Sequence, residues 1–106
     1  MKNDKILSLL GLAAKAGKAK SGEFLVEKTV KENKAFAVII ATDCSDSSKK
    51  NYRDMCAYYN VPLIEYGTKE ELGHCIGKEF RASVAIIDEG FSKGIIKEAT
   101  TREDNR

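Results

Sequence analysis

Short apolar runs separate longer amphipathic stretches along this chain. Residues 36–41 and 82–88 are almost continuously apolar, which is the pattern of strands buried on both faces of a sheet. Residues 63–66, which follow a proline, predict another strand, and the basic residues 18–20 predict a brief edge strand. The sequence therefore predicts several short strands rather than long hairpins.

The stretches between these strands carry apolar residues at helical spacing. They predict a helix over 4–16, a second from Ser21 or Gly22 to about 33, a third with Tyr52, Met55, Cys56 and Tyr59 on one stripe, a fourth ending at Gly77, and a last one after 88. Thr68 and Glu71 form a capping box that starts the fourth helix. Helices that alternate with buried strands predict an α/β fold, specifically a three-layer α/β/α sandwich.

One hydrophobic core serves a chain of 106 residues. We expect a single domain over 1–100 and a polar, frayed tail over 101–106. Hydrophobic residues make up 42% and charged residues 32% of the chain, as in ordinary soluble proteins. No apolar run approaches the roughly 20 residues that span a bilayer, and the apolar N-terminal stretch has helical spacing. We therefore predict a cytoplasmic protein that does not bind membranes.

The net charge of +2 is unevenly distributed. Residues 1–40 carry eight lysines and four acids, whereas residues 41–106 carry ten basic and twelve acidic residues. A basic N-terminal part suits a localised anionic partner. An ordinary solvated surface explains the charge equally well.

Catalytic and metal-binding motifs are weak. Cys44, Cys56 and Cys75 are odd in number and widely spaced, which predicts free thiols in a reducing compartment and no metal site. His74 neighbours Cys75, but adjacent helical side chains point about 100° apart. Asp88 ends a strand, where it would cap the next helix as readily as act in catalysis. With no nucleotide-binding motif either, we predict neither an enzyme nor a cofactor.

The second predicted helix carries a candidate binding face. Its core face holds Leu25, Val26, Thr29 and Val30. On the opposite side, Lys28 and Lys31 fall within about 40° of Phe24. Lysines neutralise phosphates and an exposed ring stacks on an unpaired base, and Lys20 lies just upstream, at a helix start that favours anions. Alternatively, Phe24 packs on a neighbouring loop and the lysines only solubilise the helix.

A second candidate region runs from Leu72 to Arg81. The predicted helix ends at Gly77, and the loop that follows carries Lys78, Phe80 and Arg81. Glycine permits a left-handed cap and a close approach by another backbone. The same residues also fit an ordinary helix C-terminus.

Several segments together resemble a known family. They are Gly22-x5-Lys28, residues 37–41 and 58–62, Leu72-Gly73-x2-Ile76-Gly77-Lys78, and residues 84–91. Their order and spacing resemble the kink-turn-binding ribosomal proteins of the L-seven-Ae and L-thirty-e type, and most of all their bacterial YlxQ-like branch. The likeness covers roughly residues 4–98, and the Leu-Gly-x-x-x-Gly element before an apolar strand is its most specific part.

The resemblance implies a four-stranded mixed sheet within the three-layer sandwich. It also implies binding to RNA kink-turns, which are sharply bent elements with tandem sheared G·A pairs, and so suggests ribosome association. The start of the second helix would enter the bent RNA, and the loop before the last strand would clamp an extruded base. The expected RNA-binding residues are Lys20, Gly22, Phe24, Lys28, Lys31, Gly77, Lys78, Phe80 and Arg81.

The chain departs from the family pattern at two positions. Members with strong kink-turn binding carry a polar pair two and three residues after the glycine, where this chain has Phe24 and Leu25. These side chains form no hydrogen bonds with G·A edges. Two functions stay open: structured-RNA binding, or protein interaction with Phe24 and Leu25 as apolar anchors.

Overall fold

The computed structural model describes the backbone of residues 4–104 and the side chains of residues 4–101. Nine elements follow one another in this part of the chain. They are α1 (Lys5–Lys15), β1 (Ala19–Ser21), α2 (Glu23–Lys31), β2 (Ala37–Ile40), α3 (Asp46–Tyr58), β3 (Leu63–Glu65), α4 (Lys69–Cys75), β4 (Ser83–Ile86) and α5 (Glu89–Asp104). Within this described part, no helix is both long and apolar enough to cross a membrane.

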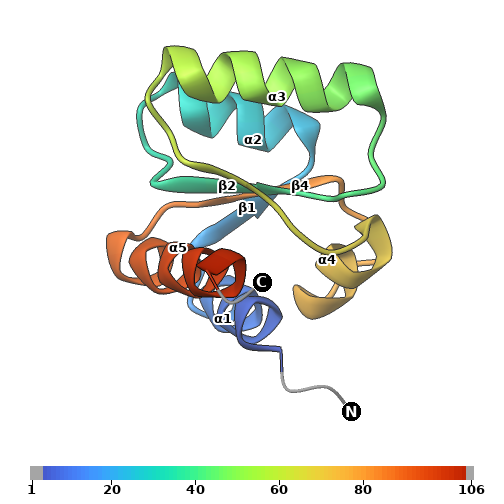
Figure 1. The fold of residues 1–106 in the computed structure, drawn as a ribbon, viewed down its shortest axis with the longest axis vertical. Coiled ribbons are helices and arrows are strands. Elements are labelled where there is room, and N and C mark those ends of the chain that lie inside the picture. The colour runs from blue at the N-terminus through green and yellow to red at the C-terminus, as the bar shows by residue number, and fades with distance from the viewer. Residues whose placement is uncertain (1–3, 105–106) are drawn as a thin grey trace.

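The four strands form one mixed sheet in the order β1-β4-β2-β3. Strand β4 is antiparallel to both of its neighbours, and β2 is parallel to β3. Helices α2 and α3 cover one face of the sheet, and α1, α4 and α5 cover the other (Figure 1). The predicted three-layer α/β/α sandwich and its four-stranded mixed sheet are confirmed.

The central strands β2 and β4 are buried along their whole length. Their side chains alternate between the two faces. Ile39 and Val84 enter the core shared with α1, α4 and α5, whereas Val38 and Ala85 enter the core shared with α2 and α3. A strand that serves two cores must be apolar at every position, which explains the continuous apolar runs in the sequence.

The helix ends follow local capping chemistry. The Asp4 carboxylate accepts from the Leu7 amide at 3.0 Å. Thr68 and Glu71 form the predicted capping box, in which each side chain accepts from the other residue's amide. Asp88 accepts from the Phe91 amide at 2.9 Å, so its role in this structure is to cap α5.

The last helix is longer than the sequence predicts. We expected a frayed tail after about residue 100, but α5 continues to Asp104. Ser92 and Ile95 anchor this helix in the core, and its C-terminal turns are a polar extension of the same helix. Residues 105–106 of the predicted tail lie outside the described residues.

Candidate nucleic-acid interface

The loop between α4 and β4 lies directly on helix α4. A Cβ atom on Gly73 would stand 2.5 Å from the carbonyl oxygen of Glu79 and 2.8 Å from the Phe80 nitrogen. Real Cβ atoms do not approach backbone so closely, so only glycine lets the loop take this course. The Lys78 amide donates to the Gly73 carbonyl at 2.8 Å, and this bond closes the loop over the helix end.

Gly77 turns the chain at the end of this helix. Its φ of +78° lies in the left-handed region, where a side chain costs roughly 1–2 kcal/mol. At the far end of the loop, the Arg81 amide donates to the Lys69 carbonyl at 3.0 Å. Backbone bonds therefore hold both ends of the loop, while the side chains of Lys78 and Phe80 stay exposed.

The corner between β1 and α2 depends on a different property of glycine. Gly22 has φ +94° and ψ 151°, a conformation that is nearly exclusive to glycine, but nothing lies within 4 Å of its absent Cβ. It is the N-cap of α2 and supplies no side-chain capping bond. The first amides of α2 therefore receive no hydrogen bond from an N-cap side chain.

The corner and the loop are tied together. The Arg81 Nε donates to the Ser21 hydroxyl at 3.2 Å, and the Gly22 amide donates to the Ser83 carbonyl at 3.1 Å. These bonds join two segments about 60 residues apart in the sequence. The name loop–helix surface is used here for Ser21 and for the predicted site residues on these segments and on the adjoining part of α2. It consists of Lys20, Ser21, Gly22, Phe24, Lys28, Gly77, Lys78, Phe80 and Arg81.

The loop–helix surface carries two aromatic and four basic side chains, and the exposed acids Glu23 and Glu79 lie beside them. Phe24 is 75% exposed and Phe80 is 60% exposed, so neither ring is buried against a neighbouring loop. Lys20, Lys28 and Lys78 are also exposed. Exposed rings with interspersed cations suit a ligand that has both stacking faces and phosphates.

Comparison with known proteins assigns the chain to a family. Residues 4–96 match the model of the ribosomal protein L7Ae/L30e/S12e/Gadd45 family. The chain belongs to this family. It is 42% identical over 88 residues to the RNA-binding protein YlxQ of Bacillus subtilis (strain 168), which covers 83% of this chain and 88% of that protein.

Two further proteins are similar to this chain, one in sequence and one in structure. The large ribosomal subunit protein eL8 of Thermoplasma volcanium is 30% identical over 96 residues, covering 90% of this chain and 79% of that protein. A protein of unknown function from Bacillus halodurans has a similar structure, with a TM-score of 0.87 and 36% identity, covering 91% of this chain and 97% of that one. The resemblance deduced from the sequence is confirmed.

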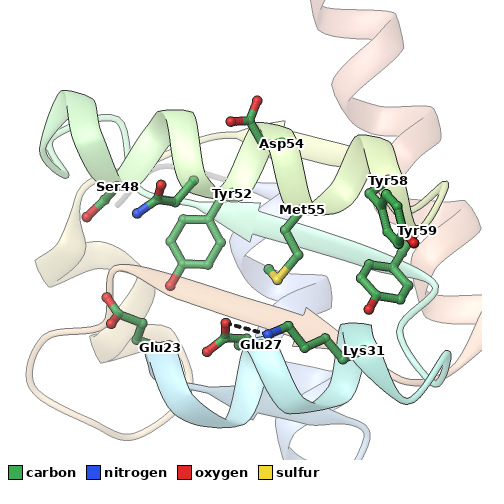
Figure 2. A pocket seen from close by; sticks show the side chains of 10 residues that line it. Glu23, Glu27, Lys31, Ser48, Tyr52, Asp54, Met55, Tyr58 and Tyr59 are labelled. Carbon is green, nitrogen blue, oxygen red and sulfur yellow. Dashed lines mark ion pairs between the residues drawn. The ribbon is translucent and has the colours of Figure 1, made fainter.

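Lys31 lies apart from the other predicted site residues of this L7Ae-type domain. It is nine positions beyond Gly22, about 14 Å further along the helix axis. Its ammonium pairs with Glu27 at 3.0 Å, and this hydrogen bond raises the pKa of Lys31. In Figure 2 its side chain lies beside Glu27, in the groove between α2 and α3. Lys28 also pairs along the helix, with Glu32 at 3.9 Å. The bond between Arg81 and Ser21 joins the 77–81 loop to the Lys20–Gly22 corner, whereas Lys31 lies in the groove.

The prediction that Leu25 lies on the core face of α2 is wrong. Leu25 is 44% exposed, whereas Val26, Thr29 and Val30 are buried. Leu25 falls about 90° from the centre of that buried stripe, so it lies at its edge. Phe24 and Leu25 consequently present two neighbouring apolar side chains to solvent beside Gly22.

The cysteine thiols are buried or half-buried, and two of them are unreactive at neutral pH. Among the described residues, Cys44 and Cys56 are buried free thiols, and Cys75 is a half-buried one. Burial raises the pKa of Cys56 to about 11. Burial, together with the nearby Asp4, raises the pKa of Cys75 to about 11. Both thiols stay protonated at neutral pH, and a protonated thiol is a poor nucleophile.

The predicted site residues do not include Ser21, which is part of the loop–helix surface, or Gly73 and Ser83, the residues beneath that surface that hold its backbone in place. Gly73 was visible in the Leu-Gly-x-x-x-Gly element, but the packing role was assigned to Gly77. Nothing in the local sequence indicates the bonds of Ser21 to Arg81 and of Ser83 to Gly22, because both are long-range contacts.

Proposed function

We propose that this chain is a non-enzymatic RNA-binding protein that binds structured RNA, of the kink-turn class or a related one, through the loop–helix surface. The observation that carries the proposal is the tie between the Gly22 corner and the 77–81 loop. Exposed rings and lysines lie on the segments that this tie joins, and the start of α2 follows Gly22. The RNA-binding relative YlxQ and the ribosomal relative eL8 support the same class of ligand.

Each part of the surface has a role suited to RNA. Lys20, Lys28 and Lys78 contact phosphates, and the first amides of α2 face an anion at the positive end of the helix dipole. Phe24 and Phe80 stack on unpaired bases. Phe24 and Leu25 make no hydrogen bonds to base edges, so the surface recognises the bent shape of the RNA rather than its G·A edges. A ribosomal RNA site fits this chemistry.

A salt titration with a matched pair of variants tests the proposal. Binding of a kink-turn RNA is measured by fluorescence anisotropy at several salt concentrations. Lys28→Ala removes one phosphate contact, so the slope of log affinity against log salt falls by about 1. Lys97→Ala removes an exposed lysine from α5, in the opposite layer, and leaves the slope unchanged. Salt-independent binding, or equal effects of both variants, contradicts the proposal.

A second candidate function is supported by one observation, the exposure of Leu25 next to Phe24. In this alternative the two side chains anchor a protein partner on the same surface. Phe24→Ala would then abolish capture of that partner, while Lys28→Ala would change little. Loss of RNA binding in both variants favours the RNA function instead.

A further inference from the structure

An open groove of about 420 Å³ lies between α2 and α3, on the face of the sheet that these two helices cover. Figure 2 shows Glu23, Glu27 and Lys31 along one side of it, with Tyr58 and Tyr59 at the end nearest Lys31. Its lining shares no side chain with the loop–helix surface, although both surfaces use α2.

The groove carries more negative than positive charge. Glu23, Glu27 and Asp54 line it together with Lys31. Glu27 pairs with Lys31 at 3.0 Å, and Asp54 pairs with Lys50 at 2.7 Å. Among the residues whose side chains are described, Glu23 forms no ion pair.

Glu23 and Glu27 also stand four residues apart on one helix face, where like charges destabilise the helix slightly. Tyr52 lines the same groove. Burial raises the pKa of Tyr52, the hydrogen bond with Ser83 lowers it, and the charges of Glu23 and Glu27 raise it further. Since Lys31 already pairs with Glu27, a further cation here would mainly neutralise Glu23, with the Glu27 carboxylate beside it.

The tyrosines add a second feature that suits a cation. Tyr58 is 79% exposed, and its ring meets that of Tyr59 edge to face, with centroids 4.9 Å apart. An exposed aromatic face attracts cations, and guanidinium groups both stack on rings and bind carboxylates bidentately. The carboxylates and the rings lie at different parts of the groove. An extended peptide with spaced arginines could therefore place one guanidinium at the carboxylates and another on a ring.

We propose that the α2–α3 groove binds an arginine-bearing segment of a basic partner protein, with one guanidinium between Glu23 and Glu27 and another on Tyr58. Charge complementarity selects this occupant. Because the whole chain has a net charge of +2, it repels a basic peptide in general, so attraction has to come from a local acidic site. The proposal does not depend on RNA binding.

A peptide titration tests this site on the full chain. The probe is a fluorescein-labelled peptide of alternating arginine and glycine, compared with one of alternating glutamine and glycine at low ionic strength. We expect only the arginine peptide to bind. The double variant Glu23→Gln/Glu27→Gln should weaken it about tenfold, and Tyr58→Ala about fivefold. Tyr58→Phe, which keeps the ring, should retain the affinity.

Glu70→Gln is the matched control. It removes the same kind of charge from exposed Glu70 in α4, in the opposite layer, and should leave peptide affinity unchanged. Glu23, Glu27 and Tyr58 are exposed, so thermal melting by circular dichroism should show intact folding. The proposal is overturned if no arginine peptide binds, if Glu70→Gln weakens it as much as the groove variants do, or if the double variant loses RNA affinity instead.

Discussion

Helix α2 borders two open surfaces that are built in different ways. Toward the α4–β4 loop, the loop–helix surface is shaped by backbone: Gly73 admits the loop, Gly77 and Gly22 turn the chain, and backbone bonds hold the loop ends. Toward α3, the groove is defined by exposed side chains such as Glu27 and Tyr58. The first surface therefore has a fixed shape, and the second has a fixed charge but adaptable side chains.

Because the two surfaces are built differently, we expect substitutions in them to have different effects. A change at a backbone-built site alters shape and stability together, whereas a change in the groove alters charge and leaves the fold intact. Ser83 links the two regions, because its carbonyl accepts from the Gly22 amide and its hydroxyl bonds Tyr52 at 2.7 Å. The groove and the loop–helix surface are thus separate on the outside and connected through the sheet.

The largest expected effect is that of Gly73→Ala. The added Cβ collides with the backbone of Glu79, so the loop must move, and overpacking of this kind costs about 3 kcal/mol of unfolding free energy. Gly77→Ala is the control, since nothing lies within 4 Å there and only the left-handed φ costs about 1 kcal/mol. Urea unfolding measures both values. A cost at Gly77 equal to or above that at Gly73 would contradict the packing role.

Tyr52→Phe should have the next largest effect. Tyr52 lines the groove, yet its hydroxyl is bonded to Ser83 in the sheet. Removing it leaves the buried Ser83 hydroxyl without this partner, at a cost of about 2 kcal/mol. Tyr58→Phe, at an exposed position of the same groove, should cost almost nothing in the same urea experiment. If the two variants lost equal unfolding free energy, the hydroxyl of Tyr52 would have no special role in stability.

Smaller effects on RNA binding should distinguish the charge of Arg81 from its positioning by Ser21. Arg81→Ala removes a cation and the bond to Ser21, and should weaken RNA binding about tenfold while lowering the salt slope by about 1. Ser21→Ala removes only the bond, and should weaken binding about threefold with an unchanged slope. The readout is anisotropy at several salt concentrations. A changed slope in Ser21→Ala would mean that the tie to Arg81 does not explain its effect.

The fold could be predicted from the sequence because its signals are local. Continuous apolar runs identified β2 and β4, helical periodicity identified the helices, and the Thr68–Glu71 capping box fixed the start of α4. The end of α5 was the main miss, because a polar extension gives no apolar stripe to count. Asp104 is therefore further along the helix than the pattern indicates.

The candidate site was predictable only in part. Exposure of Phe24 and Phe80 follows from helical geometry and from loop position, and both are exposed. Leu25 sits at the edge of the apolar stripe, where the period alone does not decide burial. The pairing of Lys31 with Glu27 depends on rotamers, and the tie of Arg81 to Ser21 depends on tertiary contacts, which no local pattern encodes.

The most direct test of the central claim is a titration against two RNAs at two salt concentrations. One RNA is a standard kink-turn, and in the other Watson–Crick pairs replace the G·A pairs, which removes the bend. If a backbone-shaped surface recognises bent RNA, the chain binds the intact kink-turn about tenfold more tightly, and both affinities fall steeply with salt. Equal affinity for the two RNAs would contradict recognition of the bent shape, and absence of binding would contradict the RNA function itself.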